Sequence, residues 1–283
     1  MKNTAETALF FPMDIPYDVA YRNGIVEYPV GPHAHNGAEI YFTMTALPDV
    51  LLGDQVFAVP AGTLILIPPF CVHQLYHETD VIYERYVLNL QDAWLKNVLF
   101  DLSVLIPGLY QNTVPQMLPL ESAQIKELAG KMRKLLNHSH FAEPSALADF
   151  FTLLDHITQL VKTQPNINQS LSLSPSQKKV NEIISYIQEH VRENLTIGEL
   201  AEHFFLHPDY LARLFKQHAH VSIGRYLTLQ KITTAQELLR NGATVAEAAE
   251  DLGFSSYAYF FKTFQRVSGI SPSRYRALYA AKP

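Results

Sequence analysis

An internal duplication in the C-terminal half of the chain restricts the possible folds more than any other sequence feature. The first copy begins at Thr196 and the second at Thr244, and matching residues are at first 48 positions apart. From Leu211 and Phe260 onward the separation is 49, so one residue has been inserted in the turn inside the second copy. A repeated segment of this length predicts two structurally equivalent units.

Each copy has the pattern of a helix, a tight turn and a second helix. Thr196 with Glu199, and Thr244 with Glu247, form capping boxes, in which the threonine and the glutamate satisfy free amides at the start of a helix. Pro208 suits the first turn of a following helix, where its missing N–H leaves no hydrogen bond unmade. This layout is typical of a helix-turn-helix reader of DNA.

The second helix of each copy is expected to enter the major groove. Its outward residues are Asp209, Ala212, Arg213 and Lys216 in the first copy, and Tyr257, Ala258, Phe261, Lys262 and Arg266 in the second. Arg213 can bind a guanine with two hydrogen bonds. Lys216, Lys262 and Arg266 are candidates for phosphate contacts. The residues 226–240 between the copies predict a connecting helix of ~15 residues.

Charge is distributed unevenly between the two halves of the chain. The whole chain has a net charge of −5. Residues 1–175 hold 9 Lys+Arg against 17 Asp+Glu, a net of −8, whereas residues 176–283 hold 13 against 10, a net of +3. Phosphate binding needs local positive charge rather than a positive average, so the C-terminal half is compatible with DNA.

Residues 180–276 resemble the AraC/XylS family of bacterial transcription regulators. The resemblance is carried by LGFSSYAYFFKTFQRVSGISPSRYR and, upstream, by YLARLFK. It implies seven helices, two helix-turn-helix units and binding to promoter DNA, often as an activator that contacts RNA polymerase. The chain has His220 and Ile223 where the family commonly has Gly and Pro, Lys231 where Arg is common, and Gln265 where Lys is common. Some of the family's phosphate contacts are therefore not carried over.

The N-terminal half shows the pattern of a β-rich domain. Short runs rich in Val, Ile, Tyr, Phe and Leu alternate with Gly, Pro and Asp turn signals, such as Gly53-Asp54. The candidate strands cover residues 24–28, 38–45, 50–52, 55–59, 63–67 and 81–90. Many short strands with frequent turns predict a small barrel or sandwich.

Two amphipathic helices are predicted after this region, over residues 121–137 and 145–161. Their apolar faces can pack on the barrel or pair with a second subunit, and the sequence does not decide between the two. The polar segment 163–177, with two prolines, is the predicted linker. The predicted organisation is an α+β chain with a cupin-like effector-binding and dimerisation domain (1–162) and an all-α DNA-binding domain (178–283).

Histidines in the N-terminal half resemble the cupin pattern. His33, His35 and Glu39 alternate on one face, and His73 follows further along the chain. Three imidazoles and a carboxylate suit Fe, Mn, Ni or Zn, so this set is a possible site for a divalent transition metal. The same residues can instead hydrogen-bond an effector without metal, or serve a structural role. Arg85 is a further candidate, because its guanidinium can bind a carboxylate or hydroxyl of an effector. Alternation places Glu84 and Arg85 on opposite faces, so only one of them can line the pocket, and the resemblance favours Arg85, since related sensors are often basic there.

These features predict a DNA-binding transcription regulator, not an enzyme, that responds to a small molecule, for which a carbohydrate is the expected class. A homodimer is expected from the two amphipathic helices and from the pairing of DNA sites. A cytoplasmic location is expected, since the chain has one cysteine, no signal peptide pattern and no membrane span. Two alternatives stay open: a cupin metalloenzyme, either an isomerase or a dioxygenase, with an accessory helical domain, and a helical domain that binds only proteins. No catalytic residue is assigned.

Overall fold

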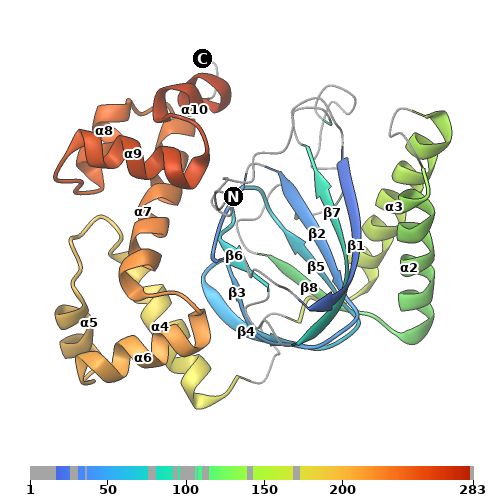
Figure 1. Ribbon diagram of the computed structural model, residues 1–283, viewed down its shortest axis with the longest axis horizontal. Coiled ribbons are helices and arrows are strands. Elements are labelled where there is room, and N and C mark those ends of the chain that lie inside the picture. Colours follow the sequence, from blue (N-terminus) through green and yellow to red (C-terminus); the bar gives the residue numbers. More distant parts are fainter. Residues whose placement is uncertain are drawn as a thin grey trace, which may run out of the picture.

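The computed structural model has a β-rich N-terminal part and a helical C-terminal part, as Figure 1 shows. The structure describes residues 17–25, 31–35, 37–75, 81–91, 95, 106, 108–109, 115–138, 143–167 and 173–280. The expected two-part α+β architecture is confirmed. Within the described residues, no helix combines the length and the apolar character that crossing a membrane requires.

Two antiparallel sheets form the N-terminal part. The larger one has the order β1 (Tyr17–Ile25), β7 (Ile82–Leu90), β2 (Ala38–Thr43), β5 (Thr63–Ile67) and β8 (Gln116–Pro119). The smaller one has the order β4 (Gln55–Val59), β3 (Leu47–Leu52) and β6 (His73–Gln74). Tyr41 and Ile65 from the larger sheet and Val50 and Phe57 from the smaller sheet share one buried core. The sheets therefore pack face to face.

The predicted strands agree with the structure where apolar runs are bounded by turns. β4 and β5 have the predicted bounds, and Gly53 has the positive φ of 63° that the β3–β4 turn requires. The predicted strand 24–28 is wrong in its start, because the observed β1 begins at Tyr17, and residues 26–28 lie outside the described part. Polar residues throughout this edge strand conceal its periodicity. β6 and β8 were not predicted, because each is too short to show alternation.

Helices α2 (Ser122–Leu136) and α3 (Pro144–Thr163) cover the outer face of the larger sheet. Met132, Phe150 and Ile157 are fully buried in the same core as Phe42 and Leu88 of the sheet. Of the two alternatives for these helices, the structure shows packing on their own domain. Their apolar faces are thus used within the chain.

The C-terminal part contains seven helices within residues 173–280, the number that the family resemblance implies. They are α4 (Pro175–Glu189), α5 (Ile197–His203), α6 (Pro208–Ala219), α7 (Ile223–Arg240), α8 (Val245–Asp251), α9 (Tyr257–Ser268) and α10 (Pro272–Tyr279). Both predicted capping boxes are present. The connecting helix α7 begins three residues before the predicted start, because Ser222 caps it by accepting the N–H of Arg225.

The linker is shorter than predicted. Helix α3 ends at Thr163, and α4 begins at Pro175 with Ser174 as its N-cap, so the last three residues of the predicted linker 163–177 are helical. Ser174 and Gln177 form a capping box that a search for Glu at this position overlooks. Residues 168–172 of the linker lie outside the described part.

The two parts of the chain are in direct contact through α4 and the smaller sheet. Leu51 and Val56 of the sheet, and Val72 just before β6, share a buried core with Ile183 and Ile187 of α4. Beside this core, Asn181 of α4 bonds both backbone groups of Val56. Its Oδ1 accepts the Val56 N–H at 2.7 Å, and its Nδ2 donates to the Val56 carbonyl at 3.2 Å. The contact is therefore both apolar and specifically hydrogen-bonded.

Candidate effector site and DNA-binding surface

Four side chains meet between the two sheets. We call them the histidine cluster: His33, His35, Glu39 and His73. Glu39 comes from β2 of the larger sheet and His73 from β6 of the smaller sheet. His33 pairs with His73 through two backbone hydrogen bonds, His33 N–H to His73 O (3.1 Å) and the reverse (2.9 Å). The cluster thus joins the two sheets, and the sequence prediction that these four residues meet is consistent with this geometry.

Each imidazole of the cluster is oriented by the backbone. The Nδ1 atoms of His33, His35 and His73 lie 3.0, 2.9 and 2.9 Å from carbonyl oxygens, those of Gly31, Gly37 and Cys71 respectively. A carbonyl oxygen only accepts, so Nδ1 must carry the proton and donate. Where such a ring is neutral, its Nε2 carries no proton and presents a lone pair. This is the arrangement that fixes histidine rings as metal ligands in proteins.

The Nε2 atoms face one carboxylate. His35 Nε2 lies 3.0 Å from Oε2 of Glu39, and His73 Nε2 lies 3.2 Å from the same oxygen. The His73 contact lacks hydrogen-bond geometry, so this buried atom has no hydrogen bond to any described residue. The three rings also lie together, with the His33 and His73 centroids 4.4 Å apart. The cluster therefore brings two imidazole Nε2 atoms against one carboxylate oxygen.

Burial sets the charges in the cluster. Burial, followed by repulsion from His73, lowers the pKa of His33 to about 3, so this ring is neutral at neutral pH. Burial alone would raise the pKa of Glu39, but the imidazoles of His35 and His73 outweigh it and hold the pKa well below its usual range. The site is consequently a buried, ionised carboxylate beside a neutral His33 ring.

A divalent transition metal fits this donor set. Two atoms that each lie about 2.1 Å from one ion are separated by about 3 to 3.4 Å at the angles of octahedral and tetrahedral sites. The separations of 3.0 and 3.2 Å around Glu39 match this spacing. Candidate ligand atoms of the three histidines all lie within 4.8 Å of one another. Metal binding, one of the three uses considered for these residues, is compatible with the Nδ1–H tautomers and with the buried His73 Nε2, which has no hydrogen bond among the described residues.

Arg85 is not part of the cluster. It lies on β7 opposite Thr43 of β2, whereas Glu39 lies opposite Asn89. Four residues of strand separate the two positions, which is about 14 Å. Arg85 is buried, and its Nη1 donates to the Tyr83 carbonyl at 3.1 Å. The alternation argument holds, because Glu84 points to the other face and accepts a hydrogen bond from the Tyr21 hydroxyl. What the sequence could not give is the position of Arg85 along the sheet.

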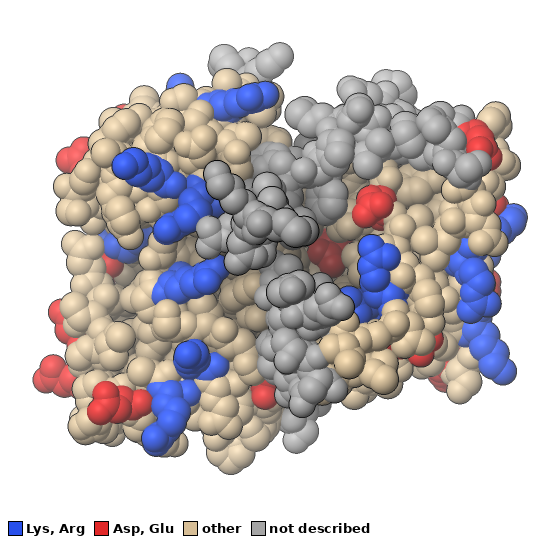
Figure 2. Space-filling model, viewed as in Figure 1, with Lys and Arg blue, Asp and Glu red and all other residues tan. Residues whose placement is uncertain are grey.

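The predicted DNA-facing residues all lie on the accessible sides of α6 and α9. Asp209, Arg213, Lys216, Tyr257, Ala258, Lys262 and Arg266 are exposed, and Ala212 and Phe261 are half-buried. Their helices anchor through the opposite side, where Phe215 and Phe264 are fully buried. Figure 2 shows groups of Lys and Arg over the helical domain, on the left of the view. The helical domain therefore combines two accessible helices with local positive charge.

Phe70 physically connects the histidine cluster to the second helix-turn-helix unit. Its backbone N–H donates to the carbonyl of His35 at 2.7 Å, and its φ of 63° turns the chain toward the helical domain. The ring lies 4.3 Å from the guanidinium of Arg240 at the end of α7. It also meets the rings of Tyr275 and Tyr279 edge-on at 5.8 Å. Any displacement of the His35 backbone acts directly on this contact.

Asp49 makes a second connection, to the first helix-turn-helix unit. Its Oδ1 lies 3.1 Å from Nδ1 of His218 near the end of α6 and accepts from Nε2 of Gln177 at 2.9 Å. Sequence reasoning missed Asp49, Phe70 and His218. The partners are separated by 169 positions for Asp49 and His218, and no periodicity marks such a pair. An aromatic residue after Pro68-Pro69 was the only local signal.

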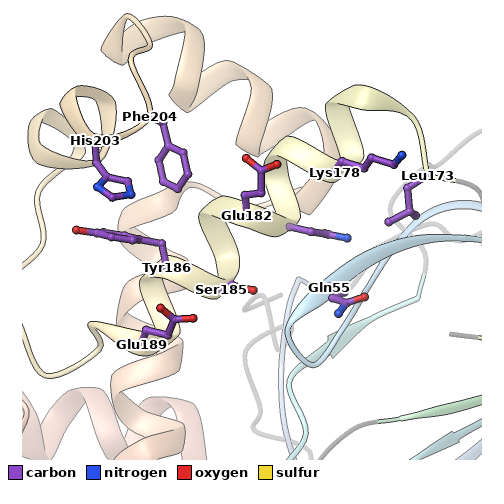
Figure 3. A pocket seen from close by; sticks show the side chains of 10 residues that line it. Gln55, Leu173, Lys178, Glu182, Ser185, Tyr186, Glu189, His203 and Phe204 are labelled. Carbon is purple, nitrogen blue, oxygen red and sulfur yellow. The ribbon is translucent and has the colours of Figure 1, made fainter. Parts of the chain in front are cut away.

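A groove of about 630 Å³ lies at the junction of the two parts (Figure 3). Gln55 of β4 lies on one side, and Lys178, Glu182 and Tyr186 of α4 lie on the other. His203 from the end of α5 stacks on Tyr186 with the ring centroids 4.0 Å apart. The groove is lined by neither the histidine cluster nor the outward faces of α6 and α9.

A sensor-like β domain docked on two helix-turn-helix units defines a ligand-responsive DNA-binding regulator, and comparisons with known families agree. Residues 16–154 match the AraC-like ligand binding domain, and residues 200–278 match a helix-turn-helix domain. The chain belongs to the AraC/XylS family of DNA-binding transcription regulators. The expected family, sensor domain and DNA-binding function are thereby confirmed.

The similar proteins are regulators rather than enzymes, as expected. The chain is 26% identical over 279 residues to the uncharacterized HTH-type transcriptional regulator YfiF of Bacillus subtilis (strain 168), covering 94% of this chain and 85% of that protein. It is 32% identical over 120 residues to the arabinose operon regulatory protein of Escherichia coli (strain K12), covering 42% and 41%. A solved structure of ToxT from Vibrio cholerae aligns with 14% identity and a TM-score of 0.39, covering 94% and 99%.

Proposed function

We propose that this regulator holds a divalent transition metal in the histidine cluster, captures its effector there, and transmits occupancy of the site to DNA binding through Phe70. The observation that carries the proposal is the chain of contacts from the His35 carbonyl to the Phe70 N–H and from the Phe70 ring to Arg240. A ligand shifts a conformational equilibrium only if it binds one arrangement better than the other. A metal or effector that moves His35 changes this contact directly.

We propose a carbohydrate as the effector class. Sugar hydroxyls can bind a metal ion through oxygen and can also donate to imidazole nitrogen. The Escherichia coli relative named as the arabinose operon regulatory protein supports this class. Imidazoles of the cluster that do not bind metal would then orient the sugar. We also propose contact with RNA polymerase and assembly as a homodimer. A dimer formed through α2 and α3 would use the outward polar sides of these helices.

The first experiment measures metal and DNA binding together. Full-length protein is stripped with a chelator, reloaded with Mn, Fe, Ni or Zn, and titrated into labelled DNA from its own promoter region, with and without a panel of monosaccharides. We expect one metal ion per chain and a change in DNA affinity with effector of about 5- to 150-fold, the usual range of allosteric coupling. A protein that takes up no metal after reloading would overturn the metal assignment.

Two variants separate the site from its connection to DNA. His35→Ala is expected to lose the metal, whereas His156→Ala, a half-buried histidine on α3, serves as the matched control and should keep it. Phe70→Ala should keep metal and DNA binding but lose the effect of effector on DNA affinity. Ile82→Ala, which removes an exposed apolar side chain elsewhere on the sensor, is its control. An unchanged effector response in Phe70→Ala would contradict the proposed route.

A further inference from the structure

The two DNA-facing helices carry different chemistry at equivalent positions. Residues of α6 and α9 correspond at a spacing of 49. Asp209 of α6 corresponds to Ala258 of α9, and Ala212 corresponds to Phe261. The first unit therefore presents a charged residue where the second presents an apolar one, and a small residue where the second presents an aromatic ring. Equivalent backbones with different surfaces indicate two different modes of reading DNA.

The apolar residues of α9 lie in its first two turns, on sides that its own core does not use. Ser256 caps the helix by accepting the N–H of Tyr259. Tyr257 has 52% of its surface exposed, and its ring lies 6.4 Å from that of Phe261, one turn later. Ala258 is exposed beside them. In helix-turn-helix proteins, the N-terminal residues of this helix are the ones that contact base edges.

The C5 methyl group of thymine is the largest apolar group on the major-groove edge of the bases, and it is the group that apolar side chains contact there. Alanine and phenylalanine have no side-chain group that can hydrogen-bond a base. The exposed Tyr257 ring and the half-buried Phe261 ring leave apolar surface in water, and covering it with methyl groups removes that surface from solvent.

We infer that the second helix-turn-helix unit selects its half-site by packing Tyr257, Ala258 and Phe261 against thymine methyl groups. The first unit instead reads its half-site through hydrogen bonds, with Arg213 as the main donor. The inference deepens the DNA-binding part of the proposed function and rests on α9 entering the major groove. The inference requires no metal or effector. It gives each of the two units its own chemical basis for sequence preference.

The test replaces thymidine by deoxyuridine, which removes the C5 methyl and leaves every hydrogen-bonding group of the base in place. Full-length protein first selects duplexes from a randomised pool. The best duplex is then remade with deoxyuridine in one half-site at a time. Affinity should fall about fourfold for each contacted methyl group in the half-site of the second unit. It should not change in the half-site of the first unit.

Variants assign the effect to the named side chains. Phe261→Ala should lose most of the discrimination between thymidine and deoxyuridine, whereas Arg213→Ala should keep it. Tyr259→Ala is the matched control, because Tyr259 is as exposed as Tyr257 (53%) but lies on the other side of α9, against Phe254. Sequence-specific binding that is insensitive to deoxyuridine throughout would overturn the inference and leave DNA binding intact. Failure to recover any preferred duplex would count against the DNA-binding function itself.

Discussion

The two helix-turn-helix units share a backbone plan but differ in the residues placed at its two left-handed positions. In the second unit these positions are Gly253 (φ 64°) and Gly269 (φ 74°). In the first unit they are Phe205 (φ 55°) and His220 (φ 52°). Bulky residues in this region cost roughly 1–2 kcal/mol each. The second unit is therefore built with the residues that its turns favour, whereas the first tolerates strain.

The units also differ in how they contact the sensor domain. The first unit shares a buried core with the smaller sheet and is bonded to Asp49. The second unit meets the sensor through the ring of Phe70. Among the described residues, the first contact is thus a packed core, whereas the second is made by one ring against Arg240, Tyr275 and Tyr279. We therefore expect the neighbours of the first unit to support its strained turns, and the second unit to respond to the sensor.

The largest expected effect tests the difference in reading chemistry. Arg213→Ala removes the expected bidentate contact to guanine, so DNA affinity should fall about 5- to 150-fold, or about 1–3 kcal/mol, and preference should relax at one base pair. Titration of labelled duplexes that vary at each position measures both quantities. Lys262→Ala, the equivalent position in α9, should weaken all sequences alike and reduce the salt dependence by about one phosphate contact. An unchanged affinity in Arg213→Ala would restore the alternative of a helical domain that binds only proteins.

An intermediate effect tests the left-handed turn of the second unit. Gly253→Ala should lower the free energy of unfolding by about 1–2 kcal/mol, because alanine disfavours a φ of 64°. The new Cβ would also lie 2.9 Å from Oδ1 of Asn194, which must move. Urea denaturation measures the loss. Gly130→Ala on α2 is the matched control, with open space around it, and should be neutral or stabilising. Equal stability of both variants would refute the strain argument.

The smallest effect has the opposite sign and concerns the first unit. Phe205 is 95% exposed, so Phe205→Gly removes almost no packing. Relief of about 1–2 kcal/mol of strain is partly offset by the greater freedom of glycine in the unfolded chain, about 0.4–1 kcal/mol. We expect a net stabilisation of about 0.5–1 kcal/mol, seen as a higher urea midpoint at constant slope. A destabilised Phe205→Gly would mean that the exposed ring has a packing role that the structure does not record.

The sequence-based predictions were correct where a local pattern indicates which side chains are buried. The residues predicted to face DNA are accessible because a 3.6-residue period separates them from Phe215 and Phe264. The apolar faces of α2 and α3 were found by the same argument. The histidine cluster was predicted from alternation and from a resemblance in spacing, and the four side chains do meet.

The predictions failed where the answer depends on register or on contacts between distant segments. The separation of Arg85 from Glu39 follows from the pairing of β2 with β7, which alternation alone does not determine. The contacts of Phe70 with Arg240 and of Asp49 with His218 join segments more than 160 residues apart. No local pattern marks either partner, so only the folded chain reveals how the two domains are connected.

The side-chain amide of Asn181 has a consequence for how the protein can be divided. β4 is the outermost strand of the smaller sheet, and Asn181 occupies both the N–H and the carbonyl of Val56 on it. An edge strand with unpaired N–H and C=O groups can pair with other chains, which leads to aggregation. A sensor fragment that ends before α4 would expose the edge of β4, together with the apolar side chains of Leu51 and Val56, to other molecules in solution. We therefore expect removal of α4, the first helix of the DNA-binding half, to make the sensing half prone to aggregation.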